Sequence, residues 1–224
     1  MARTLCAELG MHVRGDAELA ELIVPGLRRN PRRAHLLVST VLGKHIPADP
    51  VAVRAAADRL ADLVAERLAG PCVVFGFAET ATGLGHCVAA RLDAAVYLQS
   101  TRRPGAVVHG EFTEGHSHAT SHLVQPTSPD LLSAADTLVL VDDEISTGAT
   151  ALDSIRALHG LAPHRRYVVA SLVDLRSPEH VEDNARAAAA AMLASSARST
   201  CATPCSAHRI SVARATWTGS APWP

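Results

Sequence analysis

One segment of the chain, Leu138 to Thr150, reads LVLVDDEISTGAT and determines how the rest is interpreted. Its four apolar residues followed by carboxylates are typical of a buried strand with polar groups at its carboxyl end, where open α/β sheets bind ligands. A hydroxyl-rich turn from Ser146 to Thr150 then opens a helix, and Gly148 lets the backbone approach a ligand closely. The N–H groups and the positive dipole end of a helix N-terminus favour phosphate. The segment therefore predicts a strand, a turn and a helix that together form an anion cradle.

The carboxylates of Asp142 and Asp143 stand directly before this turn. Successive strand residues point to opposite faces, so the pair needs a bend to converge on one ligand. Such acids can bind sugar hydroxyls or a magnesium ion while the turn holds a phosphate, which suits a phosphorylated sugar. Two other interpretations compete: an ordinary helix capped by Asp143 or Ser146, and the acidic cluster of a receiver domain. The receiver fold needs a lysine later in the chain, whereas the sole lysine, Lys44, lies upstream.

The rest of the chain alternates apolar runs with helical periodicity. We expect helices at 51–69, at about 84–92 and at 149–159, and strands at 72–76, 95–99, 137–141 and 167–173, with residues 142–148 as a loop. Strands that alternate with helices predict an α/β fold with a mostly parallel sheet covered on both faces. The connection between the first two strands should be right-handed.

Length and composition narrow the class of protein. The chain has 224 residues, 48% of them hydrophobic and 19% charged, and its net charge is −1. It can build one core, and it lacks the basic surface that duplex nucleic acid requires. No apolar run approaches the ~20 residues that span a bilayer, and Met1 to Gly10 does not resemble an export signal. The 5 cysteines are scattered, which favours a reducing compartment. We therefore expect a cytoplasmic protein with no nucleic-acid and no membrane partner.

Residues 100–125 are rich in Gly, His, Thr, Glu and Arg and show no sustained period, as is typical of a functional or mobile loop. Its histidines are His109, His116, His118 and His122, with Glu111 and Glu114 between them. Three interpretations stay open: titrating groups on an active-site loop, an ordinary surface loop, and a transition-metal site. The 116–118–122 spacing fits no strong zinc pattern.

The composition also suggests three regions. We expect residues 1–50 to be an N-terminal segment packing near the site, 51–183 to be the core, and 184–224 to be an atypical tail. The tail has no Asp, Glu or Lys after Asp183. A helix is expected to continue through Ala185 to Leu193, and little structure is expected beyond it. One hypothesis for this tail is a shifted reading frame or a truncated extension.

Val139 to Thr150 resembles the phosphoribosyl pyrophosphate (PRPP) signature of type I phosphoribosyltransferases, and the resemblance extends from roughly Arg28 to Arg176. It implies a central mostly parallel sheet flanked by helices, with a mobile loop over the site. Further motifs are similar to a bacterial orotate-phosphoribosyltransferase-like family found beside tellurium- and stress-resistance genes, often with a C-terminal extension called TRSP. They are Arg29-Asn30-Pro31, Gly43-Lys44-His45-Ile46-Pro47, Gly76 to Thr82, Ser100 to Arg103 and Glu114 to Thr120.

The resemblance also implies roles for individual residues. Asp142 and Asp143 match the acidic pair that holds the ribose hydroxyls and magnesium, and Asp174 sits where many members have an acid near the metal. The 5′-phosphate loop corresponds to Ser146, Thr147, Gly148, Ala149 and Thr150, and the pyrophosphate loop to Ala78, Glu79, Thr80 and Ala81. Arg102 and Arg103 fall where members place basic groups near the pyrophosphate. Pro104 to His122 matches the mobile loop, whose expected catalytic residues are Glu114, His116 and His118.

The implied reaction uses PRPP and Mg²⁺, transfers phosphoribose to a nitrogenous base and releases pyrophosphate. Three departures from the family pattern stand out. Ser146 replaces the aspartate of purine-salvage members, as in the orotate branch; Glu79 places a negative charge in the pyrophosphate loop; and the mobile loop has no lysine. The alternatives are a non-catalytic regulator that binds PRPP or a nucleotide, and a structural subunit of a stress-response assembly. Family members are often dimers, which makes a homodimer an expectation by analogy.

Overall fold

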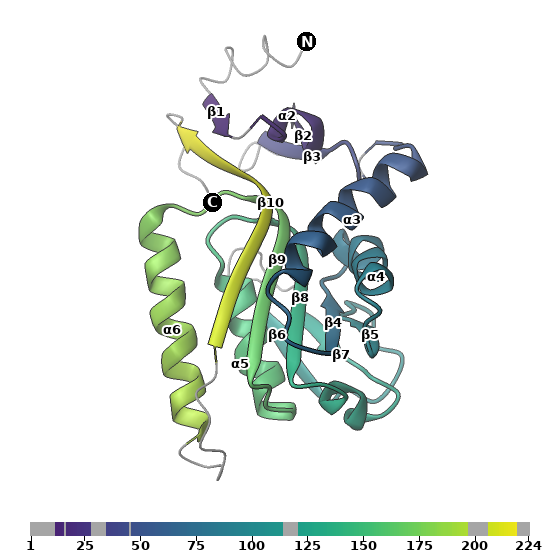
Figure 1. Cartoon of the computed structure of the whole chain (residues 1–224), viewed down its shortest axis with the longest axis vertical. Helices are drawn as coiled ribbons and strands as arrows, with labels where there is room; N and C mark the ends of the chain where they lie inside the picture. Colours follow the sequence, from purple (N-terminus) through teal and green to yellow (C-terminus); the bar gives the residue numbers. More distant parts are fainter. Residues whose placement is uncertain are drawn as a thin grey trace.

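The computed structural model describes residues 12–15, 17–27, 35–44, 46–113, 121–196 and 206–218 (Figure 1). Its strands are β1 (His12–Gly15), β2 (Ile23–Leu27), β3 (His35–Ser39), β4 (Cys72–Gly76), β5 (Val96–Gln99), β6 (Gly110–Thr113), β7 (Ser121–Val124), β8 (Thr137–Ile145), β9 (Arg166–Asp174) and β10 (Ser206–Thr218). Its helices are α2 (Leu19–Leu22), α3 (Pro50–Ala65), α4 (Ala81–Arg91), the 3₁₀ helix η2 (Pro129–Ser133), α5 (Ala149–Leu161) and α6 (Pro178–Ser196).

A six-stranded sheet in the order β1-β10-β9-β8-β4-β5 forms the centre of the protein. The strands from β10 to β5 run parallel to their neighbours, and β1 alone pairs antiparallel, with β10. The expected mostly parallel α/β sheet is therefore confirmed. The apolar strands β4, β8 and β9 lie in the middle and are buried along most of their length, as expected for strands covered on both faces.

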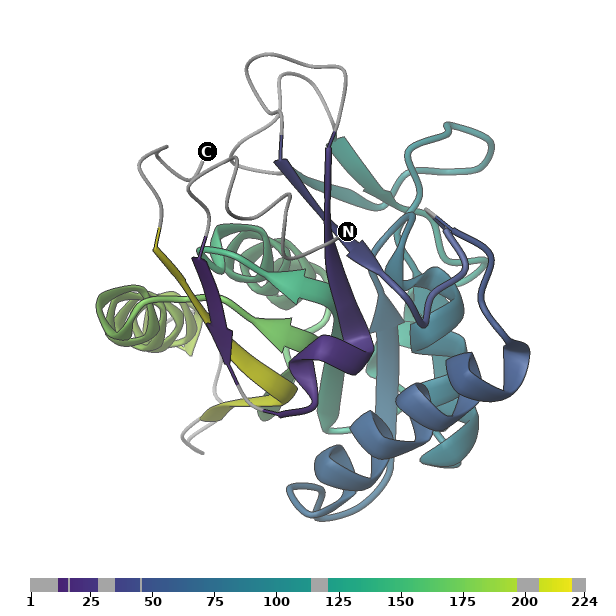
Figure 2. The same ribbon diagram turned by 90° about the horizontal axis from the view of Figure 1, so that it is seen from above.

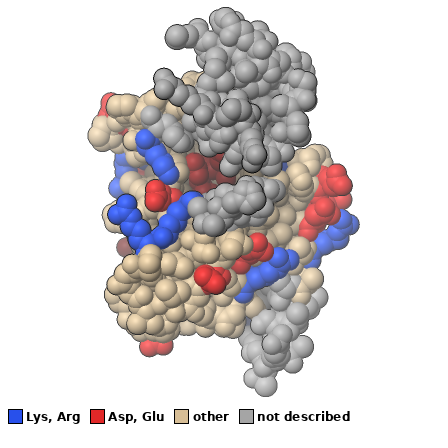
Figure 3. All heavy atoms as spheres, turned by 180° about the vertical axis from the view of Figure 1, so that it is seen from behind, with Lys and Arg blue, Asp and Glu red and all other residues tan. Residues whose placement is uncertain are grey.

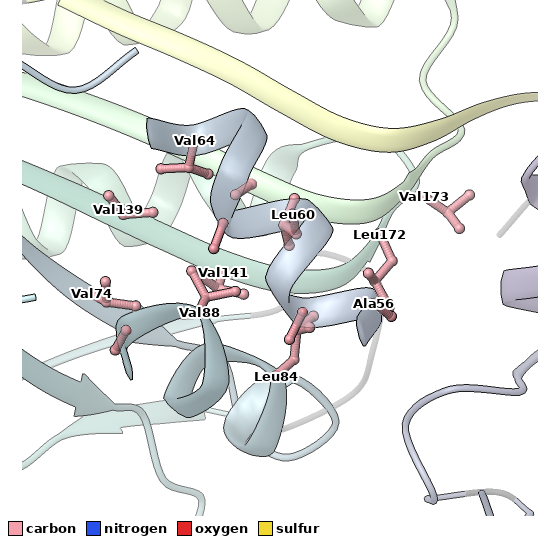
Figure 4. Packing of buried hydrophobic residues seen from close by; sticks show 14 of the residues in the cluster. Ala56, Leu60, Val64, Val74, Leu84, Val88, Val139, Val141, Leu172 and Val173 are labelled. Carbon is pink, nitrogen blue, oxygen red and sulfur yellow. The ribbon is translucent and has the colours of Figure 1, made fainter. Parts of the chain in front are cut away.

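Helices cover both faces of this sheet. On one face, α3 and α4 pack against Val74, Val139 and Val141, and Figure 4 shows Leu60, Val64 and Val88 around the last two of these strand residues. On the other face, α5 packs against the alternate residues Leu138 and Leu140, with Ala188 of α6 in the same cluster. The alternation of side chains along β8 thus supplies both halves of the core. The result is a three-layer α/β/α arrangement.

Local sequence accounts for where the elements begin and end. Asp49 caps α3, because its side chain accepts a 2.8 Å hydrogen bond from the N–H of Val51, and Pro50 occupies the first turn. The helix ends at Ala65, four residues before the expected Ala69. The expected strand at 72–76 is confirmed as β4.

The expectation that residues 142–148 form a loop is wrong for its first half. Strand β8 continues through Ile145, because its pairing with β9 extends to Ile145 opposite Asp174. Val141 packs in the cluster under α3, whereas Ile145 packs in the cluster under α5. A strictly alternating strand would place both on one face, so the strand turns about its axis between them.

Two antiparallel hairpins stand outside the central sheet. β2 pairs with β3 in the N-terminal segment, and β6 pairs with β7 within the region that the sequence predicted as a loop. Thr101 and Leu123 form a bridge that joins the second hairpin to the end of β5. Residues 114–120 lie outside the described part of the chain, as do the Arg29-Asn30-Pro31 motif and His45.

The expectation of little structure after Leu193 is wrong for residues 206–218. This stretch forms β10, which pairs along β9 from Ser206 opposite Arg166 to Arg214 opposite Asp174. Ala213 is buried there, and the stretch RISVARATWT has the β-branched and aromatic content of a strand. The helix expected at 185–193 is confirmed as part of α6. Among the described residues, no helix is both long and apolar enough to cross a membrane.

Candidate active site

The predicted site residues follow four neighbouring strands. Residues 77–81 follow β4, residues 100–103 follow β5, the acidic pair and the turn lie at the end of β8, and Asp174 ends β9. Because these strands are parallel and adjacent in the sheet, their carboxyl ends meet at one edge. Figure 2 views the sheet from above, with α3 and α4 on one side of it and α5 and α6 on the other. The topology therefore gathers the four predicted segments at one edge.

Asp142 and Asp143 lie half-buried near the carboxyl end of strand β8, and Asp142 pairs with Ser171 of β9. The Asp142 carboxylate folds along the chain and accepts a 2.9 Å hydrogen bond from the N–H of Asp143. Burial, and then the neighbouring Asp143 charge, raise the pKa of Asp142 well above its ordinary value of 3.8. Glu144 adds to the same repulsion. The end of β8 is thus a place where negative charge is crowded and where a cation or a hydroxyl donor would be stabilised.

These carboxylates fit a magnesium ion that is shared with a substrate. Magnesium is usually held by one or two protein carboxylates together with substrate phosphates and water. Asp142 and Asp143 provide this donor set, and a bound cation would offset the burial and the Asp143 charge that raise the pKa of Asp142. No group of three metal-binding side chains occurs in the described ranges, so an all-protein cage is not formed there.

The turn after β8 has the backbone that an anion cradle needs. Gly148 adopts a left-handed conformation with φ +86° and immediately precedes α5. The N–H of Ala149 donates a 3.4 Å hydrogen bond to the Thr147 hydroxyl, so this side chain folds over the helix start. A Cβ at position 148 would collide with the side-chain amide of Asn184 and approach Arg176 Cδ at 3.2 Å. Glycine is required there by both its φ angle and its neighbours.

Two residues that the sequence did not single out support the turn from behind. Asn184 of α6 donates a 2.6 Å hydrogen bond from Nδ2 to the carbonyl oxygen of Thr147. Arg176, whose side chain is 4% exposed, donates from Nε to Asp174 Oδ1 at 2.8 Å. Neither residue belongs to a recognisable motif. An Asn within a helix and an Arg after a strand are common, so only the fold reveals their contacts.

Asp174 is held by this arginine. Burial would raise the pKa of Asp174, but the hydrogen bonds and the charge of Arg176 outweigh it and hold that pKa below its ordinary value. Both carboxylate oxygens accept from the guanidinium. A metal ion at Asp174 would therefore have to compete with a buried, bidentate ion pair.

The loop after β4 is fixed by the end of β5. The peptide between Ala78 and Glu79 is cis. The N–H of Ala78 donates to Ser100 Oγ at 2.8 Å, and Arg102 Nη2 donates to the Ala78 carbonyl oxygen at 3.4 Å. Arg102 is thus turned toward the loop, whereas Arg103 is exposed. The predicted basic groups and the predicted pyrophosphate loop lie together, as the sheet order requires.

Lys44 contacts this loop, and the site prediction did not include it. Its Nζ donates a 2.8 Å hydrogen bond to Thr80 Oγ1 and lies 4.0 Å from Glu79 Oε2. The sole lysine of the chain thus comes from the N-terminal segment to residues 79–80. The motif Gly43 to Pro47 was the sequence signal from which a role for Lys44 in the site could have been predicted.

Figure 3 shows the face opposite to that of Figure 1, where acidic atoms are set back in a recess and basic side chains lie at the surface nearby.

The expected loop residues Glu114, His116 and His118 lie outside the described residues. Of the other two histidines in this region, His109 donates its backbone N–H to the Val124 carbonyl oxygen, and His122 is 1% exposed. His122 is therefore a core residue and not a surface group. Its Nδ1 lies 2.8 Å from Ser100 Oγ.

Comparison with known proteins gives the same fold. Adenine phosphoribosyltransferase from Rhodothermus marinus is 18% identical with a TM-score of 0.53, over 86% of this chain and 96% of that chain. The enzyme from Giardia lamblia, solved with 9-deazaadenine, is 17% identical with a TM-score of 0.56, over 88% and 96%. The enzyme from Trypanosoma brucei, solved with AMP, pyrophosphate and ribose 5-phosphate, is 15% identical with a TM-score of 0.54, over 87% and 78%. No curated protein sequence matches the chain.

The sequence itself provides the evidence for the family. A family model described as "Phosphoribosyl transferase" matches residues 22–203. The match includes the four predicted segments at the carboxyl edge of the sheet, Lys44 and Asn184. It spans most of the chain, and the fold agrees with it. The chain therefore belongs to the phosphoribosyl transferase family and is a phosphoribosyltransferase enzyme.

Proposed function

We propose that this enzyme uses PRPP and Mg²⁺ to transfer phosphoribose to a nitrogenous base, with release of pyrophosphate. The observation that carries the proposal is the order of groups on β8 and α5: a crowded acidic pair, then a glycine turn, then a helix N-terminus. A loop that is fixed by Ser100 and Arg102 stands beside them. An activated ribose with phosphates at both ends needs these three features at one edge.

Each group of site residues binds a different part of PRPP. Asp142 and Asp143 accept hydrogen bonds from the ribose hydroxyls, and residues 146–150 hold the 5′-phosphate through backbone N–H groups and hydroxyls. Residues 78–81 face the pyrophosphate, with Arg102, Arg103 and Lys44 to neutralise it. This assignment is supported by the contacts of Lys44 with Thr80 and of Arg102 with Ala78.

In the reaction, the bond between ribose C1 and a pyrophosphate oxygen breaks, and a bond from C1 to a ring nitrogen of the base forms. Positive charge grows on the sugar and negative charge on the leaving group. The basic residues near 78–81 stabilise the latter, and the carboxylates at the end of β8 orient the former. A magnesium ion held by Asp142 and Asp143 would supply further charge neutralisation on the pyrophosphate. The sequence predicted a closing loop at 104–122; residues 110–113 and 121–122 of it lie in strands β6 and β7, and closure of the remainder over the site would exclude water.

The acceptor base stays a prediction. Ser146 is typical of the orotate branch, whereas the solved relatives named above are adenine enzymes. Their identities of 15–18% with this chain carry the fold and not the base. We further propose that the chain belongs to the stress-operon branch, which rests on its sequence motifs and which the neighbouring genes at its locus would test.

The decisive experiment incubates purified protein with PRPP, Mg²⁺ and a panel of pyrimidine and purine bases, and measures pyrophosphate release. Release that depends on one base supports the proposal and names the acceptor. In parallel, calorimetry with PRPP and Mg²⁺ tests binding alone. Lack of binding by folded protein would reject the PRPP site itself.

A second candidate function is a PRPP- or nucleotide-binding regulator without turnover. The exposed Glu79 carboxylate favours it, because it adds negative charge where pyrophosphate would lie. PRPP binding without pyrophosphate release for any base would support this alternative. A cytoplasmic location and a homodimer remain proposals by analogy; light scattering of the purified protein tests the second.

A further inference from the structure

Ser100 lies at a junction between two parts of the proposed site. It follows β5, it is 1% exposed, and its own N–H donates to the Gly76 carbonyl oxygen at 3.0 Å. Its hydroxyl oxygen accepts the N–H of Ala78 at 2.8 Å. The same oxygen lies 2.8 Å from His122 Nδ1. Ser100 therefore connects the loop after β4 with a histidine that is 22 positions further along the chain.

His122 is as deeply buried as Ser100. It belongs to β7, it is 1% exposed, and its ring stacks on Phe112 of β6 with 4.8 Å between centroids and an interplanar angle of 11°. It also meets Phe77 edge-on, with 6.2 Å between centroids. The ring is thus packed between the β6–β7 hairpin and the loop after β4, and its Nδ1 faces Ser100 Oγ.

The hydrogen-bond capacity of Ser100 assigns the direction of these bonds. A serine hydroxyl has one proton and two lone pairs. One lone pair accepts the Ala78 N–H, and the proton can be donated to His122 Nδ1 when the imidazole carries its hydrogen on Nε2. In that arrangement each group of the chain Ala78–Ser100–His122 has a partner of the right kind.

Fixing Ala78 also determines where the next two residues of the loop, Glu79 and Thr80, direct their backbone N–H groups. With the N–H of Ala78 bound to Ser100 and its carbonyl bound to Arg102, Ala78 is held from both sides. Further along the loop, the N–H of Ala81 donates to the Phe77 carbonyl oxygen, and the N–H of Thr82 donates to the Glu79 carbonyl oxygen. Within the described ranges, the backbone N–H groups of Glu79 and Thr80 donate to no protein acceptor. These two groups are what the loop offers to an anion.

We propose that His122 is a positioning residue: through Ser100 it fixes Ala78, and thereby aims the N–H groups of Glu79 and Thr80 at the pyrophosphate of PRPP. The inference rests on the proposed function of this loop. It assigns a role to a histidine that the sequence left among three interpretations, and it makes the β6–β7 hairpin part of the support for substrate binding. His122 does not touch the substrate.

The test compares Ser100→Ala, His122→Leu and His122→Asn in the purified enzyme. Loss of the hydrogen bonds of Ser100, or of the one made by His122, should weaken the affinity for PRPP and for inorganic pyrophosphate about tenfold. The KM for the base should change little in Ser100→Ala, whereas its melting temperature should fall, because the Ala78 N–H and His122 Nδ1 lose a buried partner. Asparagine can place an amide group near the position of Nδ1, so His122→Asn should regain most of the affinity that His122→Leu loses.

Phe112→Leu provides the matched control, because it removes the ring stacked on His122 and leaves the hydrogen bonds. It should lower the melting temperature but leave the KM for PRPP within about twofold. An equal rise of that KM in Phe112→Leu and His122→Leu would overturn the inference, since packing alone would then explain both. Unchanged pyrophosphate affinity in Ser100→Ala would overturn it as well.

Amide hydrogen exchange separates this inference from the proposed function. In the free protein, Ser100→Ala should speed the exchange of the Ala78 N–H at least about tenfold, because its acceptor is lost. This readout needs no substrate. If the wild-type protein binds neither PRPP nor pyrophosphate, the proposed function fails; if it binds both and Ala78 exchanges equally fast in wild type and variant, the positioning role fails.

Discussion

Asn184 Nδ2 lies 2.6 Å from the carbonyl oxygen of Thr147, and this hydrogen bond joins the middle of α6 to the turn at the start of α5. The two residues are 37 positions apart in the chain. The same amide group occupies the space that a side chain at Gly148 would need. The shape of the predicted phosphate turn is therefore set by a helix that lies beyond the signature sequence.

Replacing Gly148 tests this arrangement. Gly148→Ala should destabilise the protein by about 1–3 kcal/mol, because a non-glycine residue is strained at φ +86° and its Cβ collides with Asn184. It should also raise the KM for PRPP. The double variant Gly148→Ala, Asn184→Ala should recover the part due to the collision but not the part due to φ, which urea unfolding of all four proteins measures. Strict additivity of the two substitutions would contradict the contact.

Removal of one carboxylate charge tests the proposed sugar site. Asp143→Asn should reduce kcat/KM by about a hundredfold or more, since the hydroxyl-binding charge is lost while shape is kept. Steady-state pyrophosphate release measures it. The melting temperature should not fall, and near-normal turnover would argue strongly against this site.

The neighbouring Asp142 should show a conflict between stability and binding. Its pKa is raised in the folded protein by burial and by Asp143, so the folded state holds its proton more tightly than the unfolded chain. The free energy of unfolding should therefore decrease as the pH rises above 3.8. Asp142→Asn should be more stable than wild type at pH 7, and this advantage should vanish at pH 3, while PRPP binding is lost. Unfolding in urea at both pH values measures the effect.

Two buried histidines at the other end of the sheet should give an opposite pH dependence. His159 Nδ1 lies 2.6 Å from the Tyr167 hydroxyl, and His164 Nδ1 lies 3.0 Å from the Ala135 carbonyl oxygen. Burial lowers the pKa of both imidazoles below the ordinary 6.5. The unfolded chain then binds more protons, so stability should be complete above about pH 6.5 and fall as the pH drops below it.

His159→Asn removes one of these titrating groups and keeps an amide near Tyr167. The slope of the unfolding free energy between pH 6.5 and pH 5 should be smaller in this variant than in wild type. Equal slopes would show that the pH dependence arises from other groups.

Lys44 provides the last test. Lys44→Met should raise the KM for PRPP by about three- to tenfold, because a cation near the pyrophosphate loop is lost at a site that is partly screened by water. Lys44→Arg should retain most of the affinity. The difference between Lys44→Met and wild type should shrink at high salt; a difference that does not depend on salt would point to packing.

The sequence predicted the parts of the site that lie on consecutive residues. Leu138 to Thr150 carries a strand, an acidic pair and a glycine turn in one segment, and strand order then brings residues 78–81 and 100–103 beside it. The contacts of Asn184 and Lys44 could not be predicted, because each depends on how a distant element packs. The ion pair of Arg176 with Asp174 joins residues two positions apart, but no motif in the sequence marks it. His122 is a similar case: the composition of residues 100–125 and their lack of a period suggested a loop, whereas its burial against Phe112 makes it part of a hydrophobic core.

The prediction that the tail has little structure failed for a different reason. Its lack of acids and lysine looked unlike a folded surface, but β-branched and aromatic content, and not charge, is what favours a strand. β10 pairs with β9 through residues 206–214 and with β1 through residues 215–218. The stretch RISVARATWT carried this strand signal, which the count of charged residues obscured.

The position of β10 also bears on how the protein is made. The strand is drawn from residues 206–218, so it leaves the ribosome after every other part of the sheet. Until then β9, whose interior residues are buried in the finished fold, presents an open row of backbone donors and acceptors. Such an edge pairs readily with strands of other chains. During synthesis, and in any shortened chain that lacks this last strand, the protein should therefore depend on chaperones to avoid aggregation through β9.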